Sequence, residues 1–167
     1  MTDIGERRTM SPMNLAESAA RYRLGELRGE DLPDIGVWML EADIDSQAIR
    51  ELAGLDRPTL RDAADVFERA LGDAGQVVPS IEDARRLLLR LVLERVVRGE
   101  MNAGDGAYAA WWRAGDLPGD EHWRPEWTRL VGLASEYEDW PEGRGQLGGD
   151  IIAAAREALA ILGPASA

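Results

Sequence analysis

Helix-start signals constrain the fold of this chain more than any other feature. Thr59 with Asp62, and Ser80 with Asp83, place a hydroxyl residue three positions before an acidic one, which is typical of a capped helix N-terminus. Each pair stands before apolar residues at helical spacing. No alternating run of β-branched residues bounded by turn residues occurs in the sequence. The sequence therefore predicts an all-α fold.

Apolar spacing and the intervening Gly and Pro residues predict a compact bundle of about eight helices. The helix over 81–98 is expected to be central and largely buried, because its apolar residues cover most of its circumference. The expected helices cover residues 11–29, 33–42, 46–53, 59–72, 81–98, 105–114, 125–138 and 150–162.

Some residues in these helices have specific expected positions. Val37 and Leu40 are expected to face inward on the second helix. Asp45 is expected to cap the third helix, and Gly54 to end it in the left-handed conformation that glycine adopts easily. The last helix is expected to begin at Asp150.

The length and the distribution of glycine favour one domain. A chain of 167 residues can bury well over half of its unfolded surface around a single core. The Gly-rich stretches are each only a few residues long, so no linker divides the helices. We expect residues 1–10 to form a flexible N-terminus and residues 11–163 to form a single helical domain.

A short internal similarity indicates a second possible level of organisation. Arg28, Gly29 and Glu30 recur as residues 98–100, and Gly36 recurs as Gly106, both at an offset of 70 residues. A duplication would give two repeated four-helix units, residues 11–79 and 80–149, followed by one further helix. Chance similarity between helical segments rich in Ala, Arg and Glu is the alternative.

Charge and composition exclude several classes of function. The chain has 19 basic and 31 acidic residues and a net charge of −12, and every basic residue is arginine. Such a chain repels polyanions, so we expect no nucleic acid partner. The lack of lysine excludes Schiff-base chemistry and P-loop phosphate binding. The lack of cysteine excludes disulfides, thiolate zinc sites and cysteine nucleophiles, and it favours a reducing compartment.

The apolar segments are too short for membrane insertion. The longest runs, residues 87–89 and 91–93, are interrupted by Arg90 and Glu94, whereas a membrane span requires about 20 apolar residues. The first residues are charged, and no apolar stretch of signal-peptide length follows them. We therefore expect a cytoplasmic protein that does not bind membranes.

Patterns for catalysis and metal binding are missing. His122 is the single histidine, and Gly119 stands where a Glu-x-x-His metal motif would need a glutamate. No Gly-x-Ser-x-Gly elbow is present to support a serine nucleophile. The acidic residues between 136 and 142 lack the calcium-loop pattern with its central glycine. We expect no catalytic residue, no metal site and no cofactor.

Tryptophan is the most informative residue type. The chain has six tryptophans, and all but Trp38 lie between residues 111 and 140, together with an acidic cluster. Most are expected to be core residues, although Trp111 and Trp112 cannot both face one centre, so one is expected to be half exposed. Exposed aromatic rings beside carboxylates suit a basic protein surface. Packing plus a solvated acidic face is the alternative. The candidate partner-binding residues are Trp111, Trp112, Trp123, Trp140, Glu136, Glu138 and Asp139.

Two stretches resemble known sequences. The stretches 44–55, IDSQAIRELAGL, and 133–144, LASEYEDWPEGR, resemble segments of uncharacterised small helical proteins of actinobacteria. This resemblance implies a helical fold and a bacterial cytoplasm, and it carries over no activity and no catalytic residue. The chain is also similar to bacterial immunity proteins, which are encoded beside toxins, in size and charge only.

These observations favour a protein-binding module over an enzyme. The first hypothesis is an immunity- or antitoxin-like protein that captures a basic partner with an acidic, tryptophan-rich surface. The alternative is a small-ligand-binding protein or a carboxylate-based enzyme, with a pocket between the two halves of the chain. A structural homodimer is a third hypothesis, and it predicts an exposed apolar face on one helix.

Overall fold

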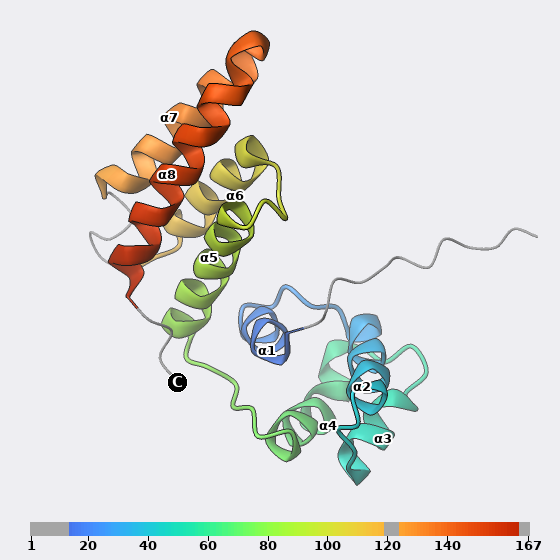
Figure 1. Cartoon of the computed structure of the whole chain (residues 1–167). Coiled ribbons are helices and arrows are strands. Elements are labelled where there is room, and N and C mark those ends of the chain that lie inside the picture. The colour runs from blue at the N-terminus through green and yellow to red at the C-terminus, as the bar shows by residue number, and fades with distance from the viewer. Residues whose placement is uncertain (1–13, 119–123, 164–167) are drawn as a thin grey trace, which may run out of the picture. The chain divides into compact units, whose positions relative to one another are not determined.

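The fold is entirely helical in the residues that the structure describes. A computed structural model describes residues 14–118 and 124–163, which form eight α-helices and two 3-10 helices and contain no strand (Figure 1). The prediction of an all-α fold of about eight helices is confirmed. The predicted flexible N-terminus, residues 1–10, lies outside the described residues. The elements are α1 (Leu15–Arg23), η1 (Gly29–Asp31), α2 (Leu32–Glu41), α3 (Gln47–Ala53), α4 (Leu60–Asp73), α5 (Ile81–Val97), α6 (Ala103–Gly115), α7 (Pro125–Asp139), η3 (Pro141–Gly143) and α8 (Arg144–Leu162).

The chain divides into two compact units between Val78 and Pro79. In the first unit, α3 packs against both α2 and α4, and η1 packs against α2 and α4. This unit has its own hydrophobic core, whose largest fully buried side chains are Leu32, Met39, Ile49, Leu52, Phe67 and Leu71.

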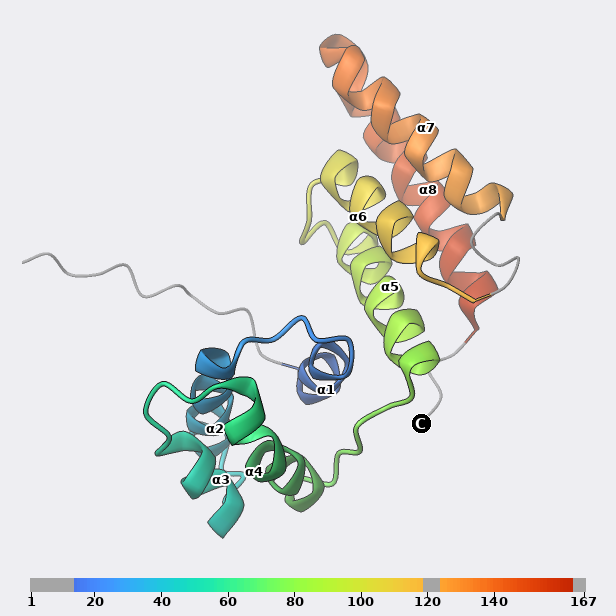
Figure 2. The ribbon, with the colours of Figure 1, turned by 180° about the vertical axis from the view of Figure 1, so that it is seen from behind.

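The second unit is a four-helix bundle. Each of α5, α6 and α7 packs against the next helix in the chain, and α8 packs back against α5. Consecutive helices run in opposite directions (Figure 2). Alanines supply much of the core of this bundle, and small side chains let neighbouring helices approach closely. Its buried core includes Leu89, Leu93, Val96, Ala107, Ala110, Ala114, Trp127, Leu130, Ala134, Ile151, Ala155 and Ala158.

Both predicted helix caps are present. The Asp62 N–H donates a hydrogen bond to Thr59 Oγ1 at 3.3 Å, and the Thr59 N–H donates to Asp62 Oδ2 at 3.4 Å. The Asp83 N–H donates to Ser80 Oγ at 3.1 Å. These bonds satisfy backbone N–H groups that have no partner within the helix, and so they define the starts of α4 and α5.

Details of α2 and α3 differ from the prediction. The buried stripe of α2 runs through Leu32, Ile35, Gly36 and Met39, so Val37 points away from it and is 43% exposed. The N-cap of α3 is Ser46, not Asp45, because the Ser46 hydroxyl accepts the Ile49 N–H at 3.2 Å. Gly54 ends α3 with a right-handed φ of −88°, since the chain continues into a tight turn there.

The first helix is shorter than predicted. It begins at Leu15, where the Asn14 side chain accepts the Ala16 N–H at 3.0 Å, and it ends at Arg23. Gly25, with a φ of +70°, stops it well before Gly29, because the left-handed conformation cannot continue an α-helix.

The last helix is longer than predicted, since it begins at Arg144 and not at Asp150. The glycines between 145 and 149 indicate a loop, because each glycine costs a helix about 1 kcal/mol relative to alanine. Leu147 is buried in this first part of α8. Tertiary packing therefore extends the helix through a segment of low intrinsic propensity.

The repeated tripeptides adopt different structures. Arg28 is extended, with a ψ of 157°, and Gly29 begins η1. Arg98 instead caps the C-terminus of α5 with a ψ of −5°, and Gly99 has a φ of +71°. The tripeptide thus adds no structural support to the duplication, which stays a prediction.

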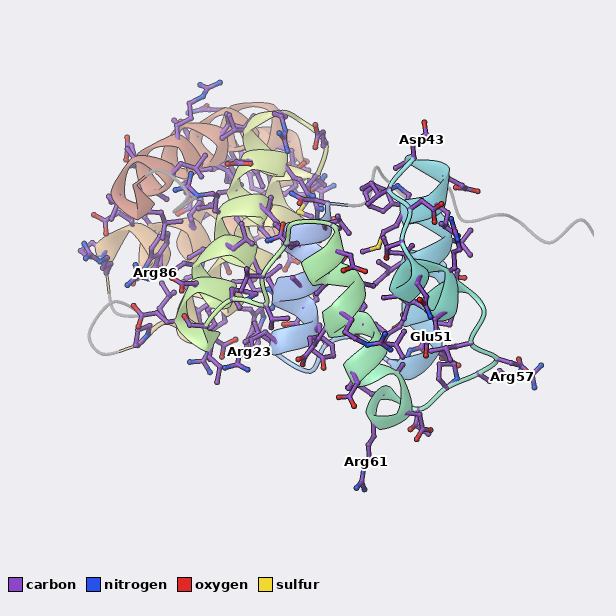
Figure 3. The ribbon with its side chains drawn as sticks, turned by 90° about the horizontal axis from the view of Figure 1, so that it is seen from below. Arg23, Asp43, Glu51, Arg57, Arg61 and Arg86 are labelled. Carbon is purple, nitrogen blue, oxygen red and sulfur yellow. The ribbon has the colours of Figure 1, made fainter. Side chains whose placement is uncertain are left out.

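Four helix ends share one backbone motif. The residue after the C-cap is left-handed, and the N–H of the following residue donates to a carbonyl five positions earlier, as from Ile44 to Met39 at 2.9 Å. Glycine occupies the left-handed position after α1, α4 and α5, as Gly25, Gly75 and Gly99. After α2 that position is Asp43, with a φ of 60°, at the helix end labelled in Figure 3.

None of the helices in residues 14–118 and 124–163 combines the length and the apolar character that crossing a bilayer requires.

Candidate functional site

Two adjacent tryptophans of α6 lie on the surface of the second unit. Trp111 is 37% exposed and Trp112 is 70% exposed. Their rings meet edge to face, with centroids 5.0 Å apart and an interplanar angle of 64°. The prediction that they cannot both face the core is confirmed. The expectation that one of them is half exposed understates the exposure, because both indoles reach the surface. An exposed aromatic pair of this kind is a feature of protein-binding surfaces.

Alanines place this pair on the outside. Ala107, Ala110 and Ala114 recur at helical spacing and form the buried face of α6. Because adjacent residues of an α-helix point about 100° apart, Trp111 and Trp112 fall outside that face. The helix thus buries its small residues and exposes its large ones.

The expectation that most tryptophans are core residues is wrong. Among the tryptophans at described positions, Trp127 alone is fully buried, at 1% exposure. Trp38 is half-buried in the first unit, and Trp140 is 52% exposed. Trp123 lies outside the described residues. Hydrophobicity by itself therefore overestimates the burial of these residues.

A tyrosine connects the tryptophan pair to α7. The Tyr108 hydroxyl lies 3.4 Å from Glu138 Oε2 and donates a hydrogen bond to it. Tyr108 precedes Trp112 by four residues, so the two side chains lie one turn apart on the same side of α6. Asp116, an exposed residue that caps the C-terminus of α6, follows Trp112 by the same interval. We call Tyr108, Trp111, Trp112, Asp116 and Glu138 the α6 aromatic surface.

Sequence reasoning missed Tyr108 and Asp116. Their positions four residues before and after Trp112 are visible in the sequence, and on a helix that spacing puts all three side chains in one row. This spacing could have identified both residues. It places Asp116 in the row only if the helix is known to continue to Gly115.

The other candidate residues lie elsewhere on the second unit. Gly104, at the start of α6, faces the ring of Tyr137, since an added Cβ would lie 2.7 Å from that ring. The C-terminal end of α7, which carries the exposed residues Glu136, Asp139 and Trp140, therefore lies beside the beginning of α6. The tryptophan pair is about two turns further along α6, or roughly 12 Å.

Trp140 has a local packing role. A Cβ atom added at Gly143 would overlap the Trp140 ring, so the indole lies directly against the glycine backbone. The predicted residues therefore do not form one site. Trp111 and Trp112 pack together, and Glu138 binds Tyr108, which lies one turn before Trp112 on α6. Trp140 instead packs on the η3 turn.

An arginine already binds one aromatic ring of this unit. The Arg144 guanidinium carbon lies 5.4 Å from the centroid of the Tyr137 ring, within the range of a cation–π contact. Arg144 Nε also donates a hydrogen bond to the Tyr137 carbonyl oxygen at 3.1 Å. One guanidinium therefore lies over a ring and donates a hydrogen bond at the same time.

No group of three or more acidic or histidine side chains in the described part of the chain is arranged to hold a metal ion. The acidic residues of the 136–142 cluster are exposed and belong to the end of α7 and to η3. His122 lies outside the described residues. A hollow lined by Asp65, Glu68 and Arg69 on α4 is open to solvent.

The chain matches no protein-family model, no curated protein and no solved structure. The resemblance of residues 44–55 and 133–144 to small helical proteins of actinobacteria therefore stays a prediction.

Proposed function

We propose that this chain is a protein-binding module, of the immunity or antitoxin kind, that captures a basic protein through the α6 aromatic surface. One observation carries this proposal. The Trp112 indole is 70% exposed and is held edge to face by Trp111, on a chain whose net charge is −12.

The exposed indoles supply the binding energy in this proposal. Large aromatic side chains dominate the energetics of protein interfaces, because each buries a large area and loses little conformational entropy. Exposing two indoles to water on the surface of α6 is unfavourable for the isolated protein, because their apolar surface stays hydrated. A partner that covers Trp111 and Trp112 removes this apolar surface from water.

The negative charge of the chain determines which partners bind in this proposal. Glu138 and Asp116 are exposed carboxylates of this surface, and the net charge of −12 attracts basic proteins and repels acidic ones. The same charge opposes binding of nucleic acid. Cysteine is missing from the sequence, which suits the reducing bacterial cytoplasm that we propose as the location.

The test uses affinity capture followed by quantitative binding. Proteins captured by the immobilised chain from a lysate of the organism that encodes it are identified, purified and titrated against the wild type. Trp112→Ala is expected to weaken binding at least about thirtyfold, because hot-spot truncations cost about 2 kcal/mol or more. Binding is also expected to weaken as salt rises.

Asp150→Asn is the control for charge, since Asp150 is an exposed carboxylate on α8, a helix that contributes no residue to the α6 aromatic surface. Circular dichroism verifies that each variant keeps its helicity. If the captured proteins are acidic, or if they bind Trp112→Ala as tightly as the wild type, the proposal is wrong.

A further inference from the structure

We infer that the side chain which the α6 aromatic surface binds on its partner is an arginine, stacked on the Trp112 indole with its N–H groups available to the carboxylates of this surface. This inference rests on the proposed function and narrows it from a basic partner to one chemical group.

One side of α6 carries aromatic and acidic side chains in a row, and this arrangement fits a planar cation. Tyr108, Trp112 and Asp116 follow each other at intervals of four residues, which is about 6 Å along the helix axis. Tyr108 holds the Glu138 carboxylate by its hydroxyl. The exposed carboxylate of Asp116 therefore follows Trp112 by one turn along α6, and Tyr108, one turn before Trp112, binds the carboxylate of Glu138.

Arginine suits this arrangement better than lysine. Tryptophan is the best aromatic surface for a cation, and a guanidinium can lie flat on it while its in-plane N–H groups remain free to bind carboxylates. An ammonium is a compact and strongly hydrated charge, and it keeps its water at a ring that is 70% exposed. Only a group that stacks and donates in perpendicular directions uses both features of the surface.

The second unit contains a contact of this same form. Arg144 lies over the Tyr137 ring at 5.4 Å, and its Nε donates a hydrogen bond to an oxygen at 3.1 Å. The contact that we infer at Trp112 differs in that the arginine comes from another protein and the acceptor is a carboxylate.

Trp111 prepares the ring for this contact. Its edge-to-face packing, with centroids 5.0 Å apart, restricts the orientations that the Trp112 indole can adopt. A ring that is held before binding loses less conformational entropy when it is covered.

The test compares three helical peptides of equal length in isothermal titration calorimetry with the full chain. One peptide carries arginine at every fourth position, the second carries lysine, and the third carries citrulline, which has a shape like that of arginine but no charge. We expect the arginine peptide to bind about three- to tenfold more tightly than the lysine peptide, and the citrulline peptide to bind more weakly than either.

Variants test whether the preference for arginine over lysine arises from the α6 aromatic surface. Trp112→Leu keeps an apolar side chain but removes the aromatic face, and it is expected to reduce the arginine preference to about one. Asp116→Asn and Glu138→Gln are each expected to weaken arginine binding. The controls are Asp150→Asn and Ile161→Ala, which change an exposed carboxylate and an exposed apolar residue on α8, and they are expected to bind like the wild type.

The outcomes separate this inference from the proposed function. Equal binding of the arginine and lysine peptides, lost together in Trp112→Leu, overturns the arginine inference and leaves capture of a basic partner intact. An arginine preference that persists in Trp112→Leu also overturns the inference. If no peptide binds and Trp112→Leu turns a dimer into a monomer in analytical ultracentrifugation, the surface is a contact between two copies of this chain, and both proposals fail.

Discussion

The indole of Trp111 packs edge to face against that of Trp112, its neighbour in the chain, with ring centroids 5.0 Å apart and an angle of 64° between the rings. Adjacent residues on a helix point in different directions, so this contact forms across the outer surface of α6 and not within the core. It holds two exposed rings of one helix against each other.

The contact predicts a coupled electronic transition of the two indoles. We expect an exciton couplet in the circular dichroism spectrum that disappears in Trp111→Phe and in Trp112→Phe. The free energy of unfolding is expected to fall by less than about 1.5 kcal/mol in each variant, because both residues are partly exposed. Trp38→Phe, in the first unit, is the control and should leave the couplet in place. A couplet that survives in Trp112→Phe would contradict the contact.

The helix ends predict a stabilising substitution at Asp43. This residue is left-handed, with a φ of 60°, where three other helices of the chain have glycine. An acidic side chain at a helix C-terminus also faces the negative end of the helix dipole. Asp43→Gly is therefore expected to raise the free energy of unfolding by about 1 kcal/mol in urea denaturation.

Gly75→Asp is the matched reverse substitution, since Gly75 occupies the same position after α4 with a φ of +73°. It is expected to lower the free energy of unfolding by about 1 kcal/mol. Changes of the same sign in the two variants would exclude this account of the helix ends.

Close backbone packing around Gly29 predicts that a larger residue at this position lowers the stability of the protein. A Cβ atom added there would overlap the Pro58 carbonyl and lie 2.5 Å from Leu60 N, and neither backbone atom can move as a side chain would. Gly29→Ala is expected to lower the free energy of unfolding by about 3 kcal/mol. Gly72→Ala is the control in the same unit, because it is helical with open space around it, and it should stabilise by up to about 1 kcal/mol.

Tyr22 predicts a loss of stability at high pH. Burial, a hydrogen bond from its hydroxyl to Glu68 at 2.9 Å, and the negative charges of Glu68 and Asp65 together raise the pKa of Tyr22 to about 12. Its pKa in the unfolded chain is about 10. The folded state thus favours the protonated phenol, and this contribution is complete below pH 10 and is lost as the pH rises through 12.

The measurement for Tyr22 is urea denaturation between pH 9 and pH 12, in the wild type and in Tyr22→Phe. The wild type is expected to lose more stability over this range than the variant, which has no hydroxyl to ionise. Parallel curves for the two proteins would show that Tyr22 does not contribute to the alkaline transition.

Local chemistry explains the part of the fold that could be predicted. The caps at Thr59 and Ser80 join residues only three positions apart, so their hydrogen bonds depend on sequence spacing alone. The limits of α8 could not be predicted in this way, because its glycine-rich beginning is helical only through packing around Leu147. The same holds for Val37, whose exposure depends on which stripe of α2 meets α3.

For the candidate site, the sequence predicted the types of residue that form it but not which of these residues lie together. It indicated Trp111, Trp112 and Glu138, and it also indicated Trp140, whose indole the structure places against Gly143 of the η3 turn. Which residues come together depends on how α6 and α7 are aligned along their axes, and no pattern within a single helix encodes that alignment.

The sequence by itself determined that this chain is helical and acidic, and where α4 and α5 begin, because those properties follow from composition and from contacts between near neighbours. The tertiary structure decided which face of α6 is buried. Hydrophobicity alone favours burying the tryptophans, and Trp127 of α7 is buried, but on α6 the positions that face the closely packed core are occupied by Ala107, Ala110 and Ala114. Volume in the bundle core, and not the apolar character of each residue, therefore leaves Trp112 on the surface.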